Sequence, residues 1–210
     1  MKHEWRKFEK ELYGVKAKPI FLEVEEQQFI TIKGKGNPND QDFSNRVSAL
    51  YALAYGIKMA YKQAMKTEQD DRAVTDFAVY PLEGLWQQAK DAKEDTLEKD
   101  KLSYTIMIRQ PEFITKELVD QALDRVKIKK PNSFYESISF ESIKDGKCIQ
   151  VLHIGSYDDE PQSFAKMDAF AKEHGLKRSS DIHREIYLSN AQRTEKSKLK
   201  TILRYQVEEK

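Results

Sequence analysis

The stretch that decides the fold is residues 29–43, FITIKGKGNPNDQDF. Residues 151–164, VLHIGSYDDEPQSF, have the same order of residue types. Each begins with apolar and β-branched residues, passes through a glycine, and ends in the polar residues that start helices. Later segments repeat as well: VYPLEG (79–84) resembles IYLSNA (186–191), and TIMIRQ (105–110) resembles TILRYQ (201–206). This internal repeat predicts two modules, each with the order strand, helix, strand, strand.

Periodicity and turn residues predict the individual elements. Strands are expected at residues 21–34, 75–82, 102–109, 137–143, 147–154, 183–188 and 201–207. A long helix should follow Asn37–Asp40, with an apolar stripe at Phe43, Val47, Leu50, Ala54, Ile57 and Tyr61. Thr115 should cap a second helix, and a third should run from Pro161 to Gly175. Asp145-Gly146 predicts a hairpin, and residues 87–101 an exposed helix or loop.

The predicted class is α+β, with two modules whose junction is a common place for a ligand cleft. Residues 1–210 are expected to form one domain. Residues 1–18 would be an N-terminal arm or helix, with Trp5, Phe8 and Leu12 at helical spacing. Residues 20–110 would be the first module, and residues 111–210 the linking helix, hairpin and second module.

Composition narrows the function classes. Lys and Arg total 36 against 35 Asp and Glu, so no basic excess points to a nucleic-acid partner. The N-terminus lacks the apolar core of a signal peptide, and no apolar run reaches the ~18 residues of a membrane span. Cys148 is the only cysteine, which favours a reducing compartment. We therefore expect a cytoplasmic protein with neither a nucleic-acid nor a membrane partner.

Glu185 and Tyr187 are the main candidates for chemistry. They lie two apart on a predicted strand, so both side chains point to one face while Ile186 and Leu188 point to the core. Their face is either solvent-exposed or lines a cleft. A carboxylate in an apolar cleft could attract a cation or deprotonate a water molecule.

Aromatic and soft side chains could form the walls of a binding site. Trp86 could stack on a flat ligand or simply cover the sheet. Tyr51 and Tyr55 lie beside the main stripe of the long helix and could pack or contact a ligand. Tyr80 and Met107 are further ligand-binding candidates, since methionine adapts to varied ligands.

Other polar residues favour structural roles. Glu83 could be a second acid or could cap a turn. His153 lies among apolar residues, which favours a structural histidine. Cys148 has Lys147 beside it, but adjacent strand residues face opposite ways, so Cys148 is not expected to be a nucleophile. The four histidines show no metal-ligand spacing, and Gly34-Lys35-Gly36 matches no nucleotide-binding loop, so neither metal nor cofactor is expected.

Four segments resemble the GyrI-like family, the effector-binding domain of multidrug-sensing activators: residues 78–86, 151–157, 183–188 and 201–207. The resemblance implies a pseudo-twofold-related pair of strand-helix-strand-strand modules with a ligand groove between them. The family's glutamate, followed two residues later by tyrosine, matches Glu185 and Tyr187. The chain departs from the activators in having no room for a helix-turn-helix before residue 20, which puts direct transcriptional control in doubt.

Leu82–Trp86 is similar to a stand-alone subgroup of hydrolases that open the cyclopropane ring of DNA-alkylating natural products. The resemblance thus implies a hydrophobic planar small molecule as the partner and its hydrolysis, hence detoxification, as the activity. The alternative is a non-catalytic module that sequesters or senses aromatic cations. A third reading, a protein–protein inhibitor like the gyrase-inhibiting family member, lacks the acidic charge excess that a nucleic-acid mimic needs.

Overall fold

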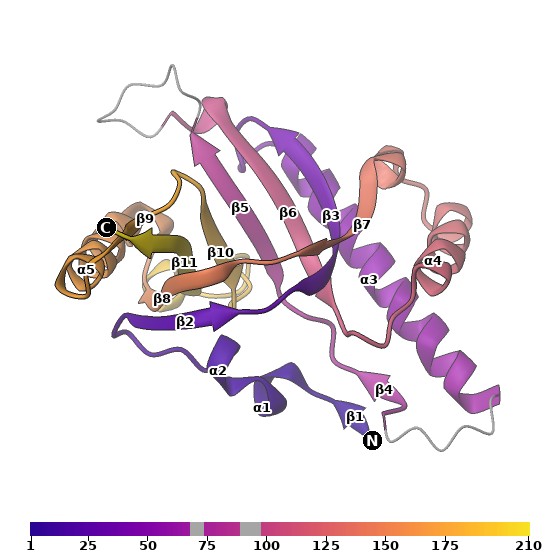
Figure 1. Cartoon of the computed structure of the whole chain (residues 1–210). Helices are drawn as coiled ribbons and strands as arrows, with labels where there is room; N and C mark the ends of the chain where they lie inside the picture. The colour runs from indigo at the N-terminus through magenta and orange to yellow at the C-terminus, as the bar shows by residue number, and fades with distance from the viewer. Residues whose placement is uncertain (68–73, 89–97) are drawn as a thin grey trace.

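The computed structural model describes residues 1–67, 74–88 and 98–210 (Figure 1). One large antiparallel sheet dominates the fold, with the strand order β2-β8-β11-β10-β5-β6-β3-β7 and β9 paired to β11. Its strands are β2 Ile20–Val24, β3 Gln27–Lys35, β5 Leu82–Gln88, β6 Leu102–Gln110, β7 Ile138–Ile143, β8 Gly146–Ile154, β9 Leu176–Arg178, β10 His183–Tyr187 and β11 Lys200–Glu209. The helices are α1 Trp5–Phe8, α2 Lys10–Tyr13, α3 Gln41–Thr67, α4 Lys116–Lys129 and α5 Glu160–Glu173.

The strand order places the second module's strands beside those of the first. The series β3, α3, β5, β6 gives the sheet order β3-β6-β5, and the series β8, α5, β10, β11 gives β8-β11-β10. The two halves meet where β5 pairs with β10. This is the arrangement that the repeat predicts, so the α+β class is confirmed, while the duplication itself and the module boundaries stay predictions.

Helices α3 and α5 cover one face of the sheet. On that face, directly paired residues of neighbouring strands point the same way: Glu185 of β10 lies opposite Leu203 of β11 and Gly84 of β5. Leu203 packs in a buried cluster with Met167 of α5. The α3 side chains belong to a larger core with Trp86 and other residues of β5 and β6. Glu185 therefore lies on the helix-bearing face, between the regions that α3 and α5 cover.

The opposite face is covered in part by the N-terminal arm. Trp5 and Tyr13 are buried, and their rings pack against Tyr80, with centroids 6.1 and 5.9 Å from its ring. Trp5 Nε1 donates to the Val79 carbonyl at 3.0 Å. The first strand, β1 (Lys2–His3), also pairs with β4 (Asp76–Phe77). The arm forms two short helical turns rather than one amphipathic helix, and it packs on the face away from Glu185.

Three sequence predictions are wrong in detail. Residues 21–34 form two strands, because β2 pairs with β8 while β3 pairs with β6 and β7. The strand expected at 75–82 is limited to β4, and β5 begins after Pro81, which has no N–H for a sheet ladder. Asp145-Gly146 makes a turn, with Gly146 at φ 65°, but not a hairpin, since β7 and β8 pair with different strands.

The remaining elements agree with the predictions. The long helix, the two shorter helices and the strands at 102–109, 137–143, 147–154, 183–188 and 201–207 all form, within a few residues of their expected ends. The Thr115 side chain accepts a hydrogen bond from the Leu118 N–H, as a cap should. Residues 99–101 form a turn of 3₁₀ helix, and most of the segment predicted at 87–101 lies outside the described residues.

Candidate functional site

A chain of hydrogen bonds fixes Glu185 on the helix-bearing face of β10. Trp86 Nε1 donates to the Tyr187 hydroxyl at 2.9 Å, and that hydroxyl donates to Glu185 Oε2 at 2.8 Å. The other carboxylate oxygen, Oε1, lies 3.0 Å from His183 Nε2. Strand alternation brings these groups together, because His183, Glu185 and Tyr187 share one face while Ile186 is buried on the other.

Aromatic rings pack against Trp86 and Tyr187, the two residues that continue this hydrogen-bond chain. Trp86 is buried, with ring centroids 5.8 Å from Phe43 and 5.2 Å from Tyr104. On the other side, Tyr157 meets Tyr187 edge to face at 6.0 Å. The half-buried Glu185 is therefore connected through Tyr187 to two groups of aromatic rings. Tyr187 contacts Glu185 directly, and Trp86 is linked to it through Tyr187; their roles in binding or catalysis stay predictions.

A second carboxyl group, Glu160, lies beside Glu185. It is the first residue of α5, 7% exposed, and its Oε1 atom has no hydrogen-bond partner among the described residues. Burial, then the negative charge of Glu185 and that of Asp158, raise the pKa of Glu160 to about 9. A helix N-terminus favours a negative charge, but here burial and repulsion outweigh that effect. Glu160 is therefore the neutral member of a carboxyl pair.

The neighbouring phenols also keep their protons. Burial and the charge of Glu185 raise the pKa of Tyr157 to about 12, and the same two causes raise the pKa of Tyr187 well above its ordinary value. A protonated Tyr187 can only donate to Glu185, as the hydrogen-bond chain requires. The site thus combines one carboxylate acceptor with several proton-bearing groups.

Sequence reasoning missed Glu160 and His183. Asp159-Glu160-Pro161 reads as an ordinary helix start, and no spacing along the chain connects Glu160 with residues of β10. In the structure, Glu160, His183 and Glu185 each offer one donor atom, and these atoms lie within 4.8 Å of one another. Two carboxylates and an imidazole are ligand types that bind divalent cations such as Zn²⁺. These three residues could hold a metal ion, although the sequence predicts none.

Three predicted ligand-binding residues are not brought to Glu185. Glu83 and Met107 project to the opposite face of the sheet, where Arg184 Nη1 lies 2.8 Å from Glu83 Oε2 and 3.2 Å from Met107 Sδ. Tyr80 is buried under the arm, where its hydroxyl donates to Glu9. Side chains along β5 point alternately to the two faces of the sheet. Glu83 and Trp86 are an odd number of positions apart, so they point to opposite faces.

The two tyrosines of α3 lie apart from this hydrogen-bond chain. Tyr51 is half-buried, and burial raises the pKa of its hydroxyl, which hydrogen-bonds to the Leu82 backbone. Tyr55, one turn further on, is 56% exposed. Their contact with a ligand stays a prediction.

The structural roles expected for His153 and Cys148 are confirmed. His153 is buried, with Nδ1 2.9 Å from Ser163 Oγ and Nε2 2.9 Å from the Ser156 carbonyl. Cys148 is fully buried, and burial raises the pKa of its thiol to about 12. Neither side chain is available for nucleophilic chemistry.

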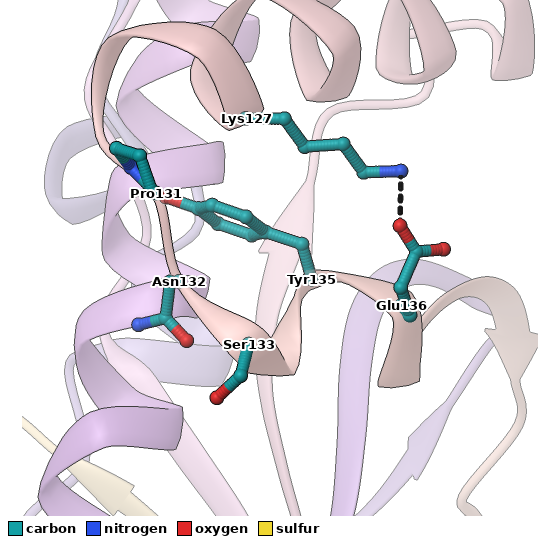
Figure 2. Close-up of a pocket in the computed structure, with 6 residues that line it drawn as sticks. All are labelled: Lys127, Pro131, Asn132, Ser133, Tyr135 and Glu136. Carbon is teal, nitrogen blue, oxygen red and sulfur yellow. Dashed lines mark ion pairs between the residues drawn. The ribbon is translucent and has the colours of Figure 1, made fainter.

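A surface hollow of about 420 Å³ lies elsewhere, between the end of α4 and the start of β7 (Figure 2). It is lined by Lys127, Pro131, Asn132, Ser133, Tyr135 and Glu136. An ion pair of 2.7 Å between Lys127 and Glu136 spans it. None of the predicted site residues lines this hollow, so it contributes nothing to the Glu185 site.

Comparisons with known proteins agree with this architecture. The model of the GyrI-like small molecule binding domain matches residues 17–206. A hydrolase from Listeria innocua is 33% identical, with 99% of this chain and 100% of that chain covered and a TM-score of 0.87. An uncharacterized conserved protein from Listeria innocua is 32% identical, with 98% and 100% covered and a TM-score of 0.86. The comparison with curated proteins returns no match.

A more distant structure shares the fold alone. The C-terminal domain of EcmrR is 12% identical, with 92% of this chain and 98% of that domain covered and a TM-score of 0.51. Within the described ranges of this chain, no helix combines the length and the apolar character needed to cross a membrane.

Proposed function

Because the chain belongs to the GyrI-like small-molecule-binding family, we propose that it binds a hydrophobic, planar electrophile beside Glu185 and hydrolyses it. The substrate class is a DNA-alkylating natural product with a cyclopropane conjugated to a carbonyl group, so the reaction is a detoxification. The observation that carries the proposal is the Glu185 carboxylate, hydrogen-bonded to Tyr187 and His183, with Trp86 and Tyr157 in contact with Tyr187. Two structural neighbours that are described as hydrolases, at 32% and 33% identity, support the reaction class.

The chemistry follows from the fixed carboxylate. Glu185 accepts a proton from a water molecule while that water attacks a ring carbon, and the aromatic rings hold the flat substrate and exclude bulk water. General-base assistance contributes about 10²–10⁴-fold in rate. Tyr187 orients Glu185, since its hydroxyl already donates to that carboxylate. Ring strain lowers the intrinsic barrier, so orientation and one base suffice.

Turnover by the purified protein tests the proposal. Wild type should convert a cyclopropane-containing DNA alkylator repeatedly into its water adduct, detected by mass spectrometry, and Glu185→Gln should lower kcat by about 10²-fold or more. Glu173→Gln is the matched control, because Glu173 is an exposed glutamate at the end of α5. An unchanged kcat in Glu185→Gln would show that Glu185 is not the general base of the reaction.

The alternative is a binding module without turnover. Among the described residues, neither Glu160 nor Glu185 forms an ion pair with a lysine or arginine, which favours attraction of an aromatic cation. This reading predicts saturable binding of such a cation, weakened in Glu185→Gln, and no product above the enzyme-free control.

A further inference from the structure

We propose that Glu160, His183 and Glu185 form a binding site for a divalent metal ion of the Zn²⁺ class. One ligand atom from each side chain lies within 4.8 Å of the other two. His183 and Glu185 are two apart on β10 and share its helix-bearing face, while Glu160 is the first residue of α5. Three ligands from two elements therefore converge on one point. The site is additional to the proposed hydrolysis and does not depend on it.

The spacing of the ligand atoms suits a tetrahedral ion. Zinc lies about 2.0–2.2 Å from imidazole nitrogens and carboxylate oxygens, so two such atoms on one tetrahedral zinc are about 3.3–3.6 Å apart. His183 Nε2 and Glu185 Oε1 are already 3.0 Å apart. A side-chain rotation that moves the Glu160 carboxylate by about 1–2 Å brings it into the same range, which leaves a fourth position for water.

An independent sign of a ligand is the unpartnered carboxyl group of Glu160. This residue is 7% exposed, and its Oε1 atom has no hydrogen-bond partner in the part of the chain that the structure describes. Such an atom has lost its hydration without gaining a protein contact, and a bound cation restores an interaction. Neither Glu160 nor Glu185 forms an ion pair with a lysine or arginine among the described residues. A divalent cation balances the two adjacent carboxylates and replaces the proton that one of them otherwise carries.

Neighbouring side chains orient the ligands. The Tyr187 hydroxyl donates to Glu185 Oε2 at 2.8 Å, which leaves Oε1 on the side of His183. Phe164, one turn after Glu160 on α5, packs edge to face against the His183 ring with centroids 4.9 Å apart. Helix α5 thus supplies one ligand and positions another. Contacts of this kind around the ligands are typical of metal sites, because they fix the direction of the donor atoms.

The ligand types select the class of cation. Imidazole nitrogen suits Zn²⁺, Cu²⁺ and Ni²⁺, whereas Ca²⁺ takes about 6–8 oxygen ligands and Mg²⁺ prefers an octahedron of oxygens. Two carboxylates and one imidazole, with one open position, are the ligand set of a zinc ion that keeps a water molecule. Because the bound ion takes an electron pair of Glu185, metal binding and proton abstraction by Glu185 exclude each other.

Isothermal titration calorimetry of the tag-free protein tests the site. Wild type should bind one Zn²⁺ per chain in the absence of substrate, and Mg²⁺ much more weakly. His183→Gln and Glu160→Gln should each weaken Zn²⁺ binding by at least about 10²-fold, since loss of an outer partner alone costs about 10–100-fold. His174→Gln is the matched control and should bind as wild type does, because His174 is an exposed histidine at the end of α5. Absence of Zn²⁺ binding, or equal affinity in wild type and the two ligand variants, would overturn the proposal.

Nitrogen-15 NMR of the histidine rings locates the ion. One equivalent of Zn²⁺ should shift the Nε2 resonance of His183, which is identified by its absence from His183→Gln, and should leave that of the buried His153 unchanged. Shifts confined to other histidines would overturn the assignment. Circular dichroism and thermal unfolding establish that the variants are folded. Because binding is measured without substrate, a protein that binds Zn²⁺ but forms no product loses only the proposed hydrolysis, and one that turns over substrate but binds no Zn²⁺ loses only the metal site.

Discussion

Replacing Arg184 by methionine is expected to lower the free energy of unfolding by about 3–5 kcal/mol, because it leaves Glu83 buried without a partner. The side chains of Glu83 and Arg184 are 2% and 3% exposed, and Arg184 also pairs with Asp145 at 2.7 Å. Asp145 keeps a second arginine, Arg204, at 3.0 Å, so Glu83 is the group that loses its only ion-pair partner among the described residues. Since domains are stable by about 5–15 kcal/mol, this loss is a large fraction of the total.

A double-mutant cycle isolates the pair. Glu83→Gln/Arg184→Met should be more stable than Arg184→Met alone, with a coupling energy of about 2 kcal/mol. The assay is urea unfolding followed by tryptophan fluorescence, with circular dichroism as the second probe for two-state behaviour. Turnover per folded molecule should be retained in Glu83→Gln, because Glu83 faces away from Glu185. A loss below about 1 kcal/mol in Arg184→Met, or a large loss of turnover in Glu83→Gln, would refute the division between the two faces.

Three further predictions concern the Glu185 face. Tyr187→Phe removes the acceptor of the Trp86 N–H and the donor to Glu185, so it should destabilise the fold by about 1–3 kcal/mol and lower kcat more than it changes KM; urea unfolding and steady-state kinetics check both. Zn²⁺ should inhibit hydrolysis by binding to Glu160, His183 and Glu185, and His183→Gln should weaken both the inhibition and the calorimetric binding signal. Between pH 4.5 and about 9, native Glu160 holds a proton that the unfolded chain has lost, so the free energy of unfolding should fall as pH rises, and less steeply in Glu160→Gln.

The sequence predicts the elements of the fold well because periodicity and turn residues are local signals. The stripe of α3, the Thr115 cap and the alternation of β10 are each encoded within a few residues. The hairpin predicted at Asp145-Gly146 fails because strand pairing is not local. Asp145 instead contacts arginines from β10 and β11, 39 and 59 positions along the chain, and nothing in the local sequence encodes these contacts.

The same distinction explains the candidate site. Glu185 and Tyr187 can be assigned to one face from their spacing, and the family resemblance points to them as the site. Nothing in the sequence around Glu83 distinguishes it from a catalytic acid, because Arg184, the arginine that pairs with it, lies 101 positions away. The sequence around Glu160 likewise gives no sign that it belongs to the site, because its proximity to Glu185 depends on how α5 packs over the sheet.

The acidic side chains near the two faces of the sheet differ in their partners, and this difference is a guide to function. On the arm-covered face, Glu83, Asp145 and Glu9 each pair with an arginine. Such groups balance their charges and offer nothing to a ligand. On the helix-bearing face, Glu160 and Glu185 have no arginine or lysine partner in the described chain, and burial and negative neighbours raise the pKa of Glu160 to about 9. Holding two such acids together costs stability, and groups of this kind cluster at functional sites.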